Sequence, residues 1–250
     1  MKPLIAFDRL GDGPPVILVV GAFNTRETGA PLAEALAHKH TVLTYDRRGR
    51  GDSGDSASYA VEREIEDLDR LIQEVGGKAA VFGFSSGAAL ALAAAAHGLA
   101  IPRLALFDLP LRAGGPANPV DHAAALDALV RAGRRGDAVE YFQGRMVGMP
   151  EAVIAQQRHA PFRAALEAMA HTLVYEATVL GDGLLPMDQV RAVRAPTLAI
   201  AAGKGPPFMR ETAEVLARAL PDGRARVLEQ ATHDLVPEVL APPLLEFFAA

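Results

Sequence analysis

A serine between two glycines is the residue of this sequence best suited to covalent chemistry. The segment reads Gly83-Phe84-Ser85-Ser86-Gly87, and it follows an apolar run and opens an alanine-rich one. A G-x-S-x-G pattern between a strand and a helix is typical of a nucleophile elbow, a sharp turn that lifts the serine hydroxyl above the strand end. We therefore expect Ser85 to be a nucleophile, the alternative being an ordinary turn flanked by glycines.

Such a serine needs a base, because its hydroxyl is a weak nucleophile at its free pKa. Histidine is the side chain best placed to accept and return a proton near neutral pH. His233 follows the last predicted strand and precedes the C-terminal helix, which places it at the carboxyl ends of the strands with Ser85. We predict that His233 is the base, the alternatives being a solvated loop histidine or a metal ligand without partners. The remaining histidines lie at opposite strand ends, at a far helix end or in a long helical segment.

The elements that must position these residues are short apolar runs alternating with helical patterns. We expect strands at 16–20, 41–45, 79–84, 103–108, 197–202 and 225–229, with an antiparallel edge at 4–10. Expected helices are 31–38, 61–75, 86–97, 210–220 and 237–248. Strands that are apolar throughout are typical of a sheet buried on both faces. The predicted fold is therefore α/β, a mostly parallel twisted sheet with helices on both faces.

The alternation stops between Pro110 and Arg194, where the sequence favours helices alone. These helices are expected at about 120–134, 137–148, 151–159 and 161–180. A structureless loop of such length is implausible inside a globular domain. We interpret 111–189 as a helical insertion over one end of the sheet, with 1–110 and 190–250 forming the core domain.

Three segments, in this order, resemble the α/β-hydrolase superfamily in its serine-nucleophile branch with a helical cap. They are the segment 46–53, which reads Asp-Arg-Arg-Gly-Arg-Gly-Asp-Ser, the turn at Ser85 and the late loop with His233. The first is similar to the D-x-R-G-x-G-x-S pattern that is structural in many members, so its charges need no substrate to explain them. The resemblance covers nearly the whole chain and implies an α/β-hydrolase fold whose cap is the insertion. It implies neither a cofactor nor a metal.

Two backbone amides are expected to stabilise a developing oxyanion. The amide of Ser86 lies at a helix N-terminus, where backbone N–H groups point outward. In the family, the second donor comes from the loop after the first strong strand, where His-Gly is common; here Gly21 and Ala22 stand in their place. Because a backbone amide needs no particular side chain, we expect Phe23 to supply it, the alternative being a merely tight turn.

The acid is not where most members of the family carry it. They place an aspartate after the strand that corresponds to 197–202, and here Gly205 occupies that place. A histidine without a carboxylate loses its orienting partner, so another acid is needed. Some members carry it after the strand next to the nucleophile's, where Asp108 stands here. We predict Asp108 as the acid, the alternatives being an N-cap, a rim charge or a pocket residue; Asp234 and Asp222 are expected to be structural.

Together these residues imply acyl transfer through an acyl-enzyme. We expect a cofactor-free serine hydrolase acting on a small to medium apolar carboxylic ester, thioester or lactone. The alternatives are a cofactor-free lyase, C–C hydrolase or cyclase of a biosynthetic pathway and, less favoured, a non-catalytic ligand-binding homologue. Apolar cap side chains that could line the pocket, or simply pack between helices, are Phe142, Met146, Met149, Phe162 and Met169.

The composition excludes several other classes. The chain has 250 residues, half of them hydrophobic and 22% charged, as one soluble globular domain requires. It has no cysteine, which excludes disulfides, thiolate metal sites and cysteine nucleophiles. A formal net charge of -5 disfavours nucleic-acid partners. Without an export signal or membrane span in the sequence, we expect a cytoplasmic protein with a small-molecule substrate and no membrane partner; nothing indicates its oligomeric state.

Overall fold

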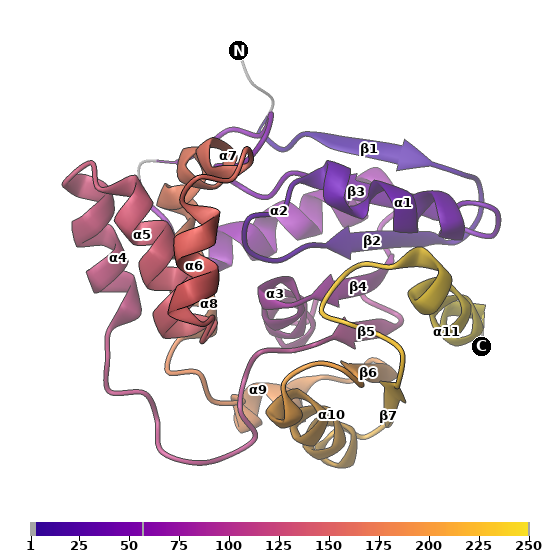
Figure 1. Cartoon of the computed structure of the whole chain (residues 1–250). Helices are drawn as coiled ribbons and strands as arrows, with labels where there is room; N and C mark the ends of the chain where they lie inside the picture. Colours follow the sequence, from indigo (N-terminus) through magenta and orange to yellow (C-terminus); the bar gives the residue numbers. More distant parts are fainter. Residues whose placement is uncertain (1–3, 57, 250) are drawn as a thin grey trace.

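A twisted sheet between two layers of helices forms the body of the protein in the computed structural model, which describes residues 4–56 and 58–249 (Figure 1). Residues 1–3, 57 and 250, which the predicted core domain includes, lie outside these ranges. The strands across the sheet run in the order β1-β3-β2-β4-β5-β6-β7. Only the pairing of β1 with β3 is antiparallel among these described strands. The bounds are β1 Phe7–Leu10, β2 Pro15–Val19, β3 Thr41–Tyr45, β4 Ala80–Phe84, β5 Leu104–Phe107, β6 Thr197–Ala202 and β7 Gly223–Leu228.

Helices cover both faces of this sheet, which confirms the predicted fold class. One face carries α1 (Arg26–Leu36) and α11 (Pro237–Ala249), and the other carries α2 (Val61–Glu74), α3 (Ser86–Ala96) and α10 (Pro207–Ala219). Alternate strand residues point to opposite faces, as the two-residue period of a strand requires. In β2, Val16 and Leu18 pack with α1 and α11, whereas Ile17 and Val19 pack with α2 and α3. Apolar strands thus serve two hydrophobic cores at once.

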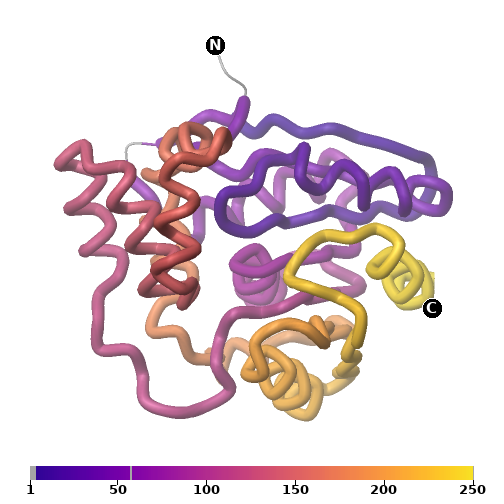
Figure 2. Tube along the Cα trace, viewed as in Figure 1, coloured from indigo at the N-terminus to yellow at the C-terminus, as the bar shows by residue number. Residues whose placement is uncertain are grey.

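Between β5 and β6 the chain forms helices that gather at one side of the sheet, as the tube trace also shows (Figure 2). We call this group of helices between β5 and β6 the helical layer. Leu126, Val139 and Leu173 are buried members of a separate hydrophobic cluster within it. The last helix of the segment, α9, returns to the body, where Val190 packs in the core of the α3 and α10 face. The elements are α4 His122–Arg131, α5 Arg135–Tyr141, the π-turn η1 Phe142–Met146, α6 Glu151–Gln157, α7 Arg163–Ala168, the 3₁₀ turn η2 Ala170–Thr172, α8 Leu173–Leu180 and α9 Met187–Ala192.

The predicted elements differ from the structure in the helices: α9 has no predicted counterpart, and the helix predicted at 161–180 is divided into α7, η2 and α8. The start of α1 also differs, since this helix begins at Arg26 and not at residue 31. Proline favours the first turn of a helix, but here Pro31 lies inside it. The first turn of α1 is held by a residue that follows β3, since the backbone N–H of Arg26 donates to Asp46 Oδ1 at 2.8 Å. This contact joins residues that are twenty positions apart, and no local pattern reveals it.

Candidate active site

Ser85 lies on a tight turn between β4 and α3, with φ 57° and ψ −129°. A positive φ is uncommon for a residue other than glycine and persists only where the surroundings enforce it. A Cβ added at Gly83 would lie 2.6 Å from Ala88 Cα, and one added at Gly87 would lie 2.2 Å from Val19 O. Both glycines are therefore required by close packing around the turn, as the sequence pattern predicts.

The sheet brings Asp108 to the same edge as Ser85. The last residues of β4 and β5, Phe84 and Phe107, are direct partners in the parallel register. The Ser85 amide donates to Phe107 O at 3.0 Å, and the Asp108 amide donates to Ile200 O of β6 at 2.9 Å. Each residue thus follows its strand by one position, at the carboxyl edge where open α/β sheets place their ligand sites.

The ring of His233 bridges these two residues. Its Nε2 lies 3.2 Å from Ser85 Oγ, and its Nδ1 lies 2.8 Å from Asp108 Oδ2. The carboxylate of Asp108 is fully buried, and its Oδ1 accepts a second hydrogen bond from the Ala202 amide at 2.8 Å. The ring also packs on Phe84, with centroids 4.8 Å apart. When Nδ1–H donates to Asp108, Nε2 is the nitrogen that can accept the hydroxyl proton of Ser85.

The position of Gly205 explains how an acid can stand after either of two strands. A Cβ added at Gly205 would lie 3.9 Å from Asp108 Oδ2. A side chain at position 205 would therefore begin close to the Asp108 carboxylate beside His233, because the ends of β5 and β6 are adjacent. Asp108 has φ 50°, a conformation that aspartate tolerates better than most residues.

The two amides proposed as oxyanion donors belong to loops that contact each other. The Ala22 amide donates to Ser86 Oγ at 3.0 Å, and Phe23 has φ 61°. A Cβ added at Gly21 would lie only 2.9 Å from Ser85 Cβ, so this loop passes very close to the serine. Within residues 4–56 and 58–249, the amides of Phe23 and Ser86 have no protein acceptor, which leaves both available to a ligand.

A cavity of about 460 Å³ opens beside Ser85 and His233. Three of the five predicted pocket residues line it, and all three come from η1 or the loop after it: Phe142, Met146 and Met149. Phe162 and Met169 lie elsewhere, which corrects that part of the prediction. Phe162 precedes α7 and is half exposed, while Met169 follows α7, a helix that packs on α5 and η2.

The chain is similar to known proteins over most of its length. Residues 16–243 match the model of the alpha/beta hydrolase family. The chain belongs to this family. It is 52% identical to an alpha/beta hydrolase from Sphaerobacter thermophilus DSM 20745, whose crystal structure superposes with a TM-score of 0.91 over 98% of this chain and 96% of that one.

Two further relatives of this alpha/beta hydrolase are more distant. The uncharacterized hydrolase YraK of Bacillus subtilis (strain 168) is 40% identical over 86 residues, so the match spans 33% of this chain and 32% of that protein. The enol-lactonase from Burkholderia xenovorans LB400 is 21% identical, with a TM-score of 0.71 over 98% of this chain and 96% of that one. At this identity the second likeness concerns the fold alone.

Several residues that line the hydrolase cavity are missed by sequence reasoning. Pro110, Pro206 and Leu235 follow β5, β6 and β7, and Phe208 lies in the first turn of α10. Their signal is available in the sequence, because residues just after parallel strands gather at one sheet edge. Gln143 has no such signal: it is 4% exposed, and its Oε1 has no hydrogen-bond partner among the described residues.

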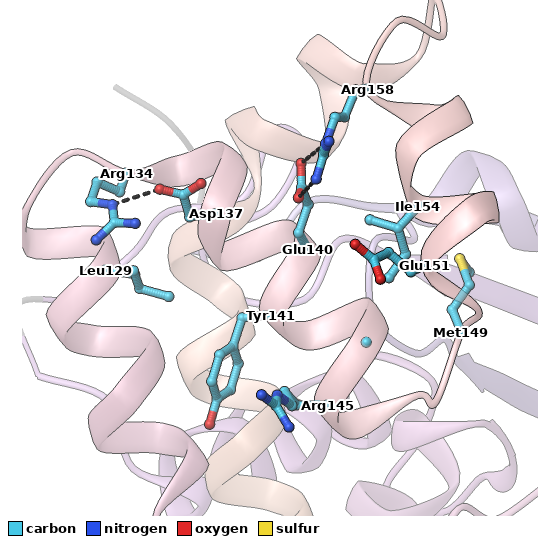
Figure 3. Close-up of a pocket in the computed structure, with 11 residues that line it drawn as sticks. Leu129, Arg134, Asp137, Glu140, Tyr141, Arg145, Met149, Glu151, Ile154 and Arg158 are labelled. Carbon is cyan, nitrogen blue, oxygen red and sulfur yellow. Dashed lines mark hydrogen bonds and ion pairs between the residues drawn. The ribbon is translucent and has the colours of Figure 1, made fainter.

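A second hollow of about 620 Å³ lies on α4, α5 and α6, and Met149 lines both cavities (Figure 3). Its charged side chains largely pair with each other: Arg134 Nε donates to Asp137 at 2.5 Å, and Arg158 Nη2 donates to Glu140 at 2.7 Å. No nucleophile faces a base among the residues that line it. We therefore place the candidate site at Ser85.

Across 4–56 and 58–249, no three histidine, aspartate or glutamate side chains cluster in a way that could hold a metal ion. In the same ranges, every helix is too short or too polar to traverse a lipid bilayer.

Proposed function

We propose that this alpha/beta hydrolase is a cofactor-free serine hydrolase that cleaves small to medium apolar carboxylic esters, thioesters or lactones through an acyl-enzyme. The observation that carries the proposal is the chain of contacts from Ser85 Oγ through the ring of His233 to the buried carboxylate of Asp108. This is the arrangement that converts a hydroxyl into a nucleophile at neutral pH.

In the proposed reaction, Ser85 Oγ attacks the substrate carbonyl while His233 Nε2 takes the hydroxyl proton. Asp108 keeps the ring in the required tautomer and stabilises the imidazolium that forms. The amides of Ser86 and Phe23 donate to the oxyanion of the tetrahedral intermediate. Collapse of the intermediate returns the proton to the leaving alcohol, thiol or lactone oxygen, and a water molecule then repeats the sequence to release the acid.

The cavity supports an apolar substrate of limited size. Phe142, Met146 and Phe208 line it, and aromatic and thioether side chains bind apolar groups without fixing a single shape. Because η1 and the loop after it contribute five of the lining residues, we propose that the helical segment 111–189 acts as a cap that selects the acyl or alcohol group.

The lyase, C–C hydrolase, cyclase and ligand-binding alternatives are motivated by the missing aspartate at Gly205. Asp108 lies 2.8 Å from His233, a contact that supports an acyl-enzyme over a mechanism that lacks an acid. A mechanism that uses histidine alone would tolerate Ser85→Ala, whereas an acyl-enzyme would not.

The test is covalent labelling with a fluorophosphonate, read by intact mass and peptide mapping. We expect one adduct, located on Ser85, that is absent in Ser85→Ala and retained in the control variant Ser58→Ala, which changes an exposed loop serine. Hydrolysis of 4-nitrophenyl acetate, butyrate and octanoate then measures preference for acyl length. A folded protein that takes no label and hydrolyses none of these esters would contradict the proposal.

A further inference from the structure

The loop that carries the Phe23 amide is held from its inner side by a buried arginine. Arg50 Nη1 donates to Gly21 O at 2.6 Å and to Asn24 O at 3.3 Å, and these two carbonyls flank Phe23 in the sequence. The side chain of Arg50 is only 1% exposed. One guanidinium group therefore fixes both ends of the short stretch that would donate to the oxyanion.

A second arginine and two carboxylates complete this buried cluster. Arg47 Nη1 donates to Val20 O at 3.3 Å, and its Nε and Nη2 donate to the two oxygens of Glu64 at 2.7 Å each. Oε1 of Glu176 accepts from Arg47 Nη1 at 2.9 Å and also from Arg50 Nη2. Within the described chain, Glu176 is the only acid that forms an ion pair with Arg50.

The charges of the cluster balance, two positive against two negative. Burial and the neighbouring charge of Arg47 lower the pKa of Arg50 to about 9, which leaves it charged at neutral pH. A buried cation is costly unless it is paired, so loss of one carboxylate would leave an uncompensated positive charge. Of the two arginines, Glu64 contacts only Arg47, whereas Glu176 contacts both. Glu64 also accepts a hydrogen bond from Tyr59 Oη at 2.8 Å.

Glu176 lies on α8, which belongs to the helical layer and not to the sheet. A second contact from that layer reaches the same loop: the ring of Phe142 packs edge-on against Phe23, with centroids 5.6 Å apart. The layer that lines the cavity is therefore joined to the proposed oxyanion loop by an ion pair through Arg50 and by an aromatic contact.

We propose that Glu176 is a positioning residue for the reaction at Ser85. Through Arg50 it fixes the Phe23 amide, so that oxyanion stabilisation depends on how the helical layer docks on the sheet. This inference rests on the proposed function. It also gives Arg50 of segment 46–53 a role in the reaction, where the family pattern implies a structural one.

The test compares Glu176→Gln with the matched control Glu64→Gln in the full-length protein. Each removes one buried carboxylate from the same cluster, but only the first removes a carboxylate that is in direct contact with Arg50. We expect both variants to unfold at lower temperature. Because loss of one oxyanion donor costs about 10²- to 10³-fold in kcat, and Glu176→Gln loosens the donor without deleting it, we expect kcat to fall about 10- to 100-fold with KM little changed. In Glu64→Gln, kcat should stay within about threefold of the wild type.

Glu176→Asp tests the same inference if Glu176→Gln does not fold, because the shorter carboxylate keeps the cluster neutral. Its carboxylate is one methylene shorter and cannot reach both guanidinium groups in the same way. We expect a clear fall in kcat with a smaller loss of stability than in Glu64→Gln. Equal kcat values in the folded Glu176 variants and in Glu64→Gln would overturn the inference alone. A wild-type protein that neither takes the fluorophosphonate nor hydrolyses esters would overturn the proposed function and this inference with it.

Discussion

Replacement of Asp108 tests the relocated acid most directly. In Asp108→Asn, the side-chain oxygen can still accept from the Ala202 amide, and asparagine tolerates the φ of 50°, so we expect the fold to survive. The amide can no longer orient the Nδ1–H tautomer or stabilise the imidazolium of His233. The same change in a Ser-His-Asp protease lowers kcat about 10⁴-fold, which corresponds to about 5.4 kcal/mol of transition-state stabilisation. We expect a loss of this order.

The structure also predicts a second-site rescue. A carboxylate oxygen lies about 2.4 Å from its own Cβ at standard bond lengths. An aspartate at Gly205, whose Cβ would be 3.9 Å from the present Asp108 Oδ2, could therefore bring an oxygen to within about 1.5 Å of that point. Asp108→Gly frees the space and suits the positive φ. Since a misplacement of about 1 Å can cost about 10²-fold, the double variant should regain about 10²-fold of the activity lost in Asp108→Gly.

The assay is kcat/KM for the best 4-nitrophenyl ester, with circular dichroism to verify folding. Gly205→Asp alone is the control, and it should be less stable than the wild type because two carboxylates then share one site. A double variant no more active than Asp108→Gly would refute the argument that the two acid positions converge. Activity of Asp108→Asn within about tenfold of the wild type would refute the role of the acid itself.

Three further predictions concern stability. Gln143→Leu removes a buried acceptor that has no partner among the described residues, but it also removes the hydrogen bond that Nε2 donates to Gln157 Oε1 at 2.7 Å. These two effects have opposite signs and similar size, so calorimetry should show a change of less than about 1 kcal/mol, and a loss of about 3 kcal/mol would contradict this. Gly87→Ala places a Cβ 2.2 Å from a backbone oxygen of β2 and should lower the free energy of unfolding by about 3 kcal/mol or more in denaturant titrations. The control Gly114→Ala has open space around it and should change that free energy by less than about 0.5 kcal/mol. Burial lowers the pKa of His171, whose ring contacts Gly49 O. The stability that neutral His171 contributes is therefore present above the ordinary histidine pKa of 6.5 and is lost as the pH falls below that value. The unfolding temperature should therefore fall less between about pH 7 and pH 5 in His171→Gln than in the wild type, and equal falls would contradict the assignment.

The sheet could be predicted from the sequence because its strands are buried on both faces. Apolar runs such as 80–84 and 198–202 have no polar face to present to water, and the structure has strands at those positions. Helix starts are less determined by local sequence. Pro31 favours a helix start, but Asp46 fixes the first turn at Arg26, and this contact exists only once the sheet has formed.

Part of the candidate site also follows from the order of the strands. Ser85, Asp108 and His233 each follow a strand, and parallel strands bring their carboxyl ends to one edge, so their proximity could be expected. The choice among apolar cap residues could not be made in this way. Phe142 and Phe162 have the same side chain, yet one is buried beside the serine and the other is half exposed. Their difference arises from how short helices pack on each other, which hydrophobic periodicity does not specify.

The arginine-rich segment shows why a structural residue and a functional one are hard to separate by type. Its three arginines are buried and paired within the protein, as a structural role requires. Yet Arg50 also donates hydrogen bonds to Gly21 O and Asn24 O, the two carbonyls on either side of the amide that would stabilise the oxyanion. An oxyanion donor acts only if its direction is fixed before the reaction begins. Rigidity of this loop is therefore part of the proposed chemistry, and the residues that supply it lie outside the cavity.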